Sequence, residues 1–152
     1  MKLSAFTDRR FVDLSLEPGT KSDVLSRLSA LIARSPHVKD GERFLADVLA
    51  REELVTTGVG HGVAFPHAKS EAVREVVFAF GRAAAPIDFG ALDGEPVRLI
   101  FLIGAPKVQE PSRVYLNLMA RLSFLMKEKD NRRRVLDATS ADEVFELLDS
   151  VK

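Results

Sequence analysis

The sequence predicts an α/β protein in which a mixed β-sheet is flanked by layers of helices. Apolar residues recur at helical spacing in several segments, and these segments alternate with others that read as strands. One stretch, Val97 to Gly104, is almost continuously apolar and is bounded by prolines, as expected of a central strand covered on both faces. With 152 residues, the chain is expected to form a single domain over residues 1–152.

Four helices are predicted from apolar periodicity and from capping residues at their starts. Thr20 and Asp23 have the spacing of a capping box, so the first helix is expected over residues 21–34. Asp40 is expected to cap a second helix that ends near Arg51, and Ser140 a final helix. A third helix is expected to begin near residues 111–112 and to carry Tyr115 on its apolar face.

Two further strands are predicted from residue type. Residues 73–81 are rich in β-branched and aromatic side chains, and residues 11–16 alternate as an edge strand would. The glycine-rich segment around residue 60 is expected to be a loop, because an ordinary strand or helix gains nothing from three closely spaced glycines.

The composition excludes several classes of function. The 22 basic residues balance the 22 acidic ones, so neither nucleic acid nor a membrane surface is indicated as a partner. The absence of cysteine excludes disulfides, thiolate metal sites and thiol catalysis. The N-terminus lacks the apolar core of a signal peptide, and no apolar run is long enough to span a bilayer. A cytoplasmic protein is the simplest expectation.

The most informative segment is Thr57 to Ser70, which reads TGVGHGVAFPHAKS. Its three alternate glycines give the backbone freedom, and Pro66 then fixes the chain immediately before His67. The result is an imidazole held at a defined place beside an amide-rich turn. Such an arrangement suits a histidine that meets an anion, and a phosphoryl group is the obvious candidate.

This segment resembles the active-site pattern of the phosphotransferase-system IIA proteins of the fructose, mannitol and nitrogen-regulatory type, roughly T-G-[IV]-G-[NH]-G-[IV]-A-[IV]-P-H. The resemblance extends over nearly the whole chain and includes Arg51, sixteen positions before His67. It implies the mannitol-type IIA fold. It also implies that His67 accepts a phosphoryl group from a histidine-phosphocarrier protein, with no metal or bound cofactor.

The resemblance gives the neighbouring residues candidate roles in the transfer. Arg51 can offer a planar fork to two phosphoryl oxygens, although an arginine at a helix end also has a simple electrostatic explanation. Thr57 is a candidate hydroxyl donor. The amides of three glycines are expected to form an anion-binding concavity; these are Gly58, Gly60 and Gly62.

His61 lies six residues before His67, where the family most often has asparagine. Two roles are left open for it: it donates a hydrogen bond to the phosphoryl group, or it only orients the loop. A metal site made by the two histidines does not match a zinc-ligand spacing and is disfavoured. The segment also fails the glycine patterns of both common nucleotide-binding motifs.

The main departure from the family lies at Tyr115, where mannitol and nitrogen-regulatory relatives carry a second histidine. A phenol can donate a hydrogen bond to His67 or its phosphate, but it cannot become a cation. Tyr115 also shares a helix face with Leu118 and Leu122, so a simple core position is the alternative.

The resemblance leaves the destination of the phosphoryl group open. Sugar-transporting members pass it to a IIB domain, whereas nitrogen-regulatory members use their phosphorylation state to control protein partners. The regulatory type is favoured for two reasons. No IIB or membrane segment is fused to the sequence, and Tyr115 in place of the second histidine suits a regulator, which needs a phosphorylation state that partners can recognise more than it needs rapid phosphoryl transfer. A non-transferring interaction module is the alternative from another class, and a metal-dependent hydrolase using His61 and His67 is the least favoured.

Overall fold

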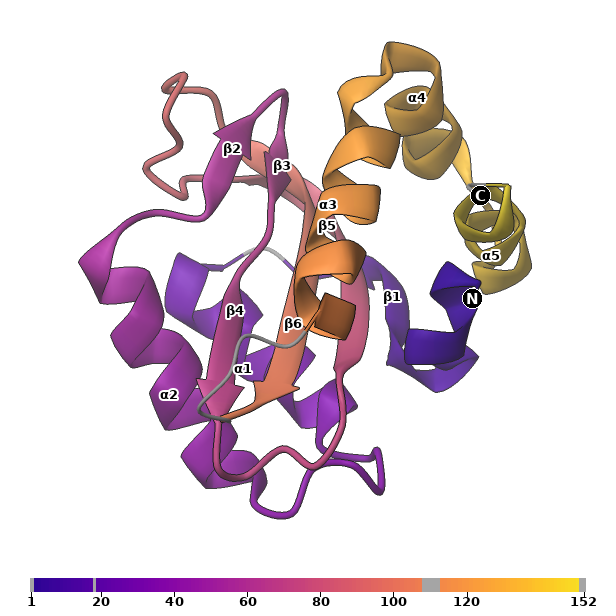
Figure 1. Ribbon diagram of the computed structural model, residues 1–152. Helices are drawn as coiled ribbons and strands as arrows, with labels where there is room; N and C mark the ends of the chain where they lie inside the picture. Colours follow the sequence, from indigo (N-terminus) through magenta and orange to yellow (C-terminus); the bar gives the residue numbers. More distant parts are fainter. Residues whose placement is uncertain (1, 18, 108–112, 151–152) are drawn as a thin grey trace.

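The computed structural model describes residues 2–17, 19–107 and 113–150, and in this part of the chain a six-stranded mixed sheet forms the centre of the molecule (Figure 1). The strand order is β1-β5-β6-β3-β2, and β4 also pairs with β6. The strands are β1 (Val12–Leu16), β2 (Gly58–Gly60), β3 (Val63–Ala64), β4 (His67–Ser70), β5 (Val77–Ile87) and β6 (Val97–Pro106).

Strand β6 organises the sheet. It pairs antiparallel with β5 on one side and parallel with both β3 and β4 on the other. At the two ends, β1 runs parallel to β5, and β2 is antiparallel to β3. The prediction of a mixed sheet with a central apolar strand is therefore confirmed.

Helices cover both faces of this sheet (Figure 1). On one face lie α1 (Lys21–Ile32) and α2 (Gly41–Leu54), and on the other α3 (Arg113–Lys127), α4 (Lys129–Asp137) and α5 (Ala141–Asp149). Two short 3-10 turns, Leu3–Phe6 and Arg9–Phe11, precede β1.

The two apolar cores show why the layers form. Alternate residues of a strand point to opposite faces, so Leu99, Phe101 and Ile103 of β6 pack in the cluster with α3 and α5. Ile100 and Leu102 pack instead in the cluster with α1 and α2. The predicted layered sandwich is thus confirmed, with β6 buried from both sides.

The predicted helix starts agree with the caps. Thr20 and Asp23 form a complete capping box, and the side chains of Asp40 and Ser140 accept hydrogen bonds from backbone amides of the helices they precede. The predicted start of the third helix at residues 111–112 lies outside the described residues. No helix among the described residues has both the length and the apolar character needed to cross a membrane.

Three features differ from the prediction. The strand expected over 73–81 begins only at Val77 and continues to Ile87, because Val73 forms an isolated bridge with Val38 instead. The expected glycine loop contains two short strands, β2 and β3, and a third, β4, follows it directly; pairing with neighbouring backbone stabilises all three. Helix α4 was not predicted, since its sequence is mostly charged and carries a single buried residue, Val135.

Arg82 of β5 holds the end of α4 against the sheet. Its Nη1 donates to the carbonyl oxygens of Val135, Leu136 and Ala138 at 3.1, 2.9 and 2.7 Å, and its Nε donates to Leu14 at 3.0 Å. A guanidinium at a helix C-terminus satisfies carbonyls that have no partner within the helix and also complements the helix dipole.

We expect Arg82→Met to lower the free energy of unfolding by about 2 kcal/mol, because several half-buried carbonyl oxygens lose a charged donor. Urea unfolding followed by circular dichroism measures this. Arg133→Met, an exposed arginine of α4, serves as the control and should change stability by less than about 0.5 kcal/mol. Equal stability of the two variants would contradict the role given to Arg82.

Candidate functional site

His67 opens strand β4 and lies opposite Ile103 of β6. The carbonyl oxygen of Pro66, just before it, accepts a hydrogen bond from the amide of Ile103 at 2.9 Å. The His67 side chain is half-buried. The structure therefore holds this imidazole on the sheet rather than on a free loop.

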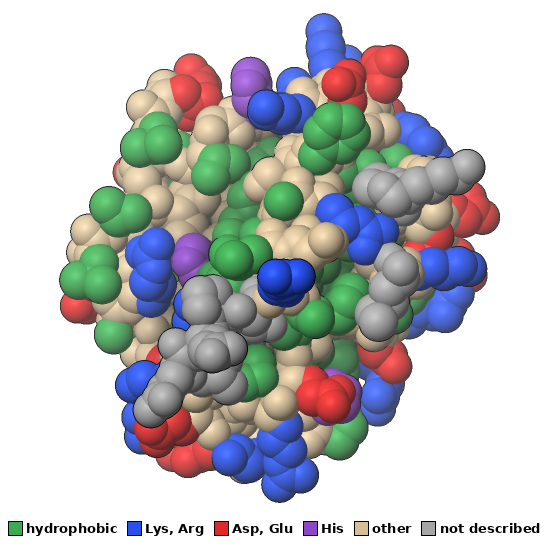
Figure 2. Space-filling view, viewed as in Figure 1, with side chains coloured by type: hydrophobic (Ala, Val, Ile, Leu, Met, Phe, Trp, Pro, Cys, Tyr) green, Lys and Arg blue, Asp and Glu red, His purple; other side chains and the backbone are tan. Residues whose placement is uncertain are grey.

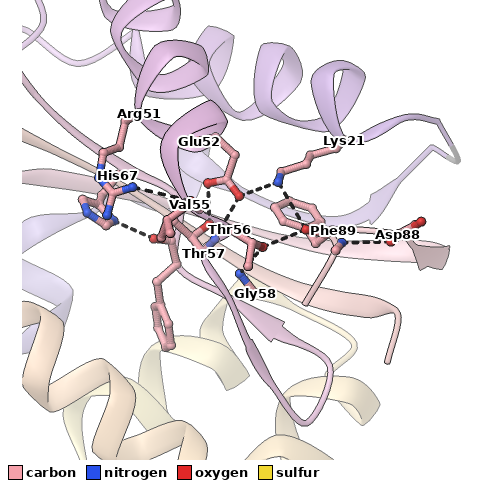
Figure 3. Close-up of polar contacts among 12 residues, drawn as sticks. Lys21, Arg51, Glu52, Val55, Thr56, Thr57, Gly58, His67, Asp88 and Phe89 are labelled. Carbon is pink, nitrogen blue, oxygen red and sulfur yellow. Dashed lines mark hydrogen bonds and ion pairs between the residues drawn. The ribbon is translucent and has the colours of Figure 1, made fainter. Parts of the chain in front are cut away.

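One ring nitrogen of His67 has a defined partner. Nδ1 lies 2.8 Å from the carbonyl oxygen of Phe65 (Figure 3). A carbonyl oxygen can only accept, so this contact requires the proton on Nδ1. In the neutral ring the lone pair then lies on Nε2, which is the nitrogen left to act as a nucleophile.

The surroundings favour the neutral form of this ring. Burial is the main cause that lowers the pKa of His67, and the positive charges of Arg51 and Lys69 lower it further. The hydrogen bond to Phe65 and the negative charge of Glu52 act in the opposite direction. The net pKa lies below the ordinary value, so the nucleophilic form is populated at neutral pH.

Arg51 supplies a positive charge beside His67. It lies in the last turn of α2, where its Nη1 donates to the carbonyl oxygen of Val55 at 3.5 Å, and its side chain extends toward His67 (Figure 3). Its charge lowers the pKa of both His67 and Tyr115, so it lies near both groups. The structure thus brings Arg51 to the site, as predicted from its spacing.

Tyr115 of α3 also lies against His67. The two ring centroids are 6.0 Å apart with an interplanar angle of 53°, and Lys69 Nζ lies 5.5 Å from the Tyr115 ring centroid. Tyr115 is buried, and this burial raises the pKa of its phenol. The residue is therefore both near the site and part of the core, so the two predicted alternatives are not exclusive.

The predicted glycine loop is a hairpin, and both backbone groups of Gly58, its first glycine, have partners. Gly58 donates its amide to the Thr56 hydroxyl and accepts from Leu92. Gly60 and Gly62 adopt positive φ values of 104° and 77°, which explains why glycine is needed on both sides of the tight turn. The amide of Gly58 is thus already paired, and the other two glycines shape the β2–β3 turn, so an anion-binding role of this segment stays a prediction.

His61 lies at the tip of this hairpin, where its φ is 58° and its amide donates to Asp93 at 3.0 Å. Along β6, Val63 pairs with Leu99 and His67 with Ile103. These positions are therefore separated by about 13 Å at the usual rise of a strand, and His61 lies beyond Val63. The structure does not bring the two histidines together, which agrees with a turn role for His61.

This separation also bears on the metal alternative. Among residues 2–17, 19–107 and 113–150, no group of three or more histidine, aspartate, glutamate or cysteine side chains is arranged to hold a metal ion. A hydrolase that binds metal between His61 and His67 has no support in this geometry.

A charged network that was not predicted from the sequence lies beside Arg51, on the side away from His67 (Figure 3). Glu52 is buried, and its carboxylate accepts from the Thr57 hydroxyl at 2.7 Å and from the Thr57 amide at 2.9 Å. Lys21 Nζ lies 2.6 Å from the same carboxylate. The Thr57 hydroxyl, a candidate donor to the phosphoryl group, is thus directed to Glu52 instead.

Lys69 was also missed, although the sequence carried a signal for it. Residues two apart on a strand share a face, so Lys69 lies on the same side of β4 as His67. For Glu52 the signal was weaker, because a glutamate next to an arginine at a helix end is normally an exposed residue.

We expect the pKa of His67, followed by NMR titration of its ring, to lie below the ordinary value of about 6.5. Arg51→Met should raise this pKa, because it removes a charge that disfavours the imidazolium form. Arg43→Met is the matched control: Arg43 lies on the same helix but pairs with Asp47. A His67 pKa that does not respond to Arg51→Met would contradict the proximity of the two side chains.

Comparison with known proteins places this geometry in a family. The family model described as "Phosphoenolpyruvate-dependent sugar phosphotransferase system, EIIA 2" matches residues 5–151. A fructose-specific EIIA component from Haloferax volcanii is 34% identical over 98% of this chain and 96% of its own length. A nitrogen regulatory protein from Pseudomonas aeruginosa is 31% identical over 88% of this chain and 86% of its own. A fructose-specific EIIABC component from Bacillus subtilis is 29% identical over 97% of this chain, which spans only 23% of that longer protein.

Solved structures of nitrogen regulatory and mannitol-type IIA proteins have a similar fold. The nitrogen regulatory protein IIA-Ntr from Neisseria meningitidis superposes with a TM-score of 0.88 at 28% identity, over 96% of this chain and 98% of that one. IIA mannitol from Escherichia coli has the same fold, with a TM-score of 0.78 at 24% identity over 93% of this chain and 97% of that one. A complex of that enzyme with phosphorylated IIB mannitol gives the same TM-score at 23% identity, over 93% and 95% of the two chains. The protein belongs to the EIIA type 2 family of the phosphoenolpyruvate-dependent phosphotransferase system.

Proposed function

We propose that this protein is a phosphocarrier in which His67 accepts a phosphoryl group from a histidine-phosphocarrier protein. The observation that carries the proposal is the fixed imidazole: Nδ1 is held by the Phe65 carbonyl, so Nε2 has the lone pair. The lowered pKa of His67 and the adjacent charge of Arg51 support the same role.

The proposed transfer needs no change in the number of protons on His67. Its Nε2 lone pair attacks the phosphorus of the donor's phosphohistidine, a new N–P bond forms, and the donor's own N–P bond breaks. The electron pair of the broken bond returns to the donor imidazole. The proton on Nδ1 stays with the Phe65 carbonyl throughout, so the ring is oriented before and after the step.

Arg51 is suited to stabilise the charge that develops on the transferring phosphoryl oxygens. Its guanidinium offers planar paired donors, and a fixed cation contributes most where the transition-state charge is spread over several oxygens. Lys69, on the same side of β4, adds a second positive charge. Tyr115 provides a phenol against His67 in place of the second histidine found in relatives.

The donor needs a surface on which to dock, and exposed apolar side chains border the site. We call Leu54, Val55, Val59 and Leu92 the apolar rim; they are 79%, 61%, 51% and 81% exposed. Val55 contacts Arg51 through its carbonyl oxygen, and the amide of Leu92 bonds to Gly58 in β2, the strand of Val59. Figure 2 shows hydrophobic side chains gathered on the side of the molecule where α2 and β2 lie. Such side chains are typical of a transient protein interface.

For the destination of the phosphoryl group, we favour regulation, as in the nitrogen regulatory relatives. The high TM-score to IIA-Ntr over nearly all of both chains supports this choice. Transfer to a separate IIB domain is the second candidate, since the fructose-specific EIIA component from Haloferax volcanii is the more identical relative of those described. Incubating the phosphorylated protein with the organism's own IIB domains separates the two, because rapid loss of the phosphoryl group to one of them would favour transport.

Intact-mass spectrometry tests the carrier chemistry directly. After incubation with phosphoenolpyruvate, the first enzyme of the system and its phosphocarrier protein, the wild type should gain one acid-labile phosphoryl group. His67→Ala should gain none, because the acceptor is gone. His61→Asn is the matched control: asparagine tolerates the positive φ at this position, and phosphorylation should persist. An unmodified wild type beside a charged donor would favour the non-transferring interaction module.

The apolar rim gives a second, separate test. We expect Leu54→Asp together with Leu92→Asp to raise the donor concentration for half-maximal rate roughly tenfold with little change in the maximal rate, because docking is weakened and the chemistry is not. Phe124→Asp alters another exposed apolar residue, which is 66% exposed and lies on α3, and this variant should have no such effect. If the rim variant and the control behave alike, the rim is not the docking surface.

A further inference from the structure

We propose that Glu52 and Lys21 are positioning residues for phosphoryl transfer, acting on His67 through Thr57. The inference rests on the role proposed for His67, but neither residue touches the imidazole or a phosphoryl group. Their part is to fix the backbone that orients the ring.

We call the ion pair of Glu52 and Lys21 the clamp. The contacts of Glu52 are those of a buried structural group rather than of a surface charge. Its side chain is only 5% exposed, and both carboxylate oxygens have charged or strongly polar partners. Lys21, at the start of α1, is 26% exposed and also donates to the carbonyl oxygen of Phe89 at 3.2 Å. A buried carboxylate is tolerated only when it is paired and hydrogen-bonded in this way.

A continuous series of hydrogen bonds runs from this clamp to His67. Glu52 fixes Thr57 through both its amide and its hydroxyl. The Thr57 carbonyl oxygen accepts from the amide of Phe65 at 3.0 Å, and the Phe65 carbonyl oxygen faces His67 Nδ1 at 2.8 Å. Glu52 holds Thr57, and the Phe65 carbonyl selects the His67 tautomer. The backbone of Phe65 alone therefore connects the two, since its amide bonds to Thr57 and its carbonyl faces His67.

The same clamp fixes the end of the helix that carries Arg51. Glu52 follows Arg51 directly in the last turn of α2, and its bonds tie this turn to α1 and to the segment before β2. Thr56 adds a parallel tie, because its hydroxyl donates to Phe89 at 2.7 Å. Loss of the clamp would therefore loosen both the imidazole of His67 and the guanidinium of Arg51.

The first test uses Thr57, which transmits the effect. We expect Thr57→Val to increase the fraction of His67 rings protonated on Nε2, seen in the ¹⁵N chemical shifts of the two ring nitrogens in the unphosphorylated protein. The rate of phosphorylation should fall about tenfold or more, as expected for a misplaced nucleophile. Thr57→Ser keeps the hydroxyl and should restore both the tautomer and the rate.

Ser70→Ala is the matched control. Ser70 is buried on β4 and donates to Asp47 of α2 at 2.6 Å, so its loss also removes a hydroxyl–carboxylate bond between α2 and the sheet. This bond is not part of the series that leads to Phe65. The variant should be destabilised yet keep the wild-type tautomer of His67.

Glu52→Gln and Lys21→Met test the charged pair itself, and both should shift the tautomer in the same direction as Thr57→Val. If Glu52→Gln does not fold, the Thr57 variants still decide the matter. A folded Thr57→Val protein with unchanged ring shifts and an unchanged rate would overturn the inference. If the wild type accepts no phosphoryl group, the proposed function fails, whereas the ¹⁵N shifts still show whether the clamp orients the ring.

Discussion

The pairing of the segment from Val63 to Ser70 with β6 is the constraint on which the rest of the site depends. Its register does not slip: Val63 pairs with Leu99, Ala64 with Ile100 and His67 with Ile103, always 36 residues apart. Only Phe65 and Pro66 interrupt the strand, because proline has no amide to donate. At this interruption the Phe65 carbonyl is turned toward the His67 ring.

The same constraint connects the core to the chemistry. Strand β6 is buried from both sides, so it has little freedom to move. Strand β4 is held in place in turn, because it pairs with β6 along its whole length. For the phosphoryl transfer proposed above, an imidazole on such a strand keeps its position without help from a mobile loop. Positioning and fixed charge supply most of the catalysis in reactions of this kind. The half-buried ring also has a lowered pKa for the same reason: the sheet that holds it also removes it from water.

The sequence allowed good predictions wherever a local pattern had one physical meaning. Capping residues marked the helix starts, and the apolar stretch after Pro96 marked the central strand. The motif and its spacing singled out His67 and Arg51, and the structure places the two side chains near each other, whereas their roles in transfer stay a proposal. The hairpin was missed because alternate glycines signal backbone freedom, whereas pairing with β6 decides how that freedom is used. His61 lies in the same motif as His67, and only the strand register shows that the two are separated.

The role proposed for Glu52 could not be predicted from the sequence, because it depends on contacts with residues distant in the sequence. Successive residues of a helix point about 100° apart, so the last turn of α2 can send Arg51 toward His67 and Glu52 toward Lys21 (Figure 3). A buried ion pair of this kind contributes little net stability compared with apolar packing. Its presence is better explained by the orientation proposed above: the pair of Glu52 and Lys21 holds the end of α2 in place, and the guanidinium of Arg51 is directed at the site.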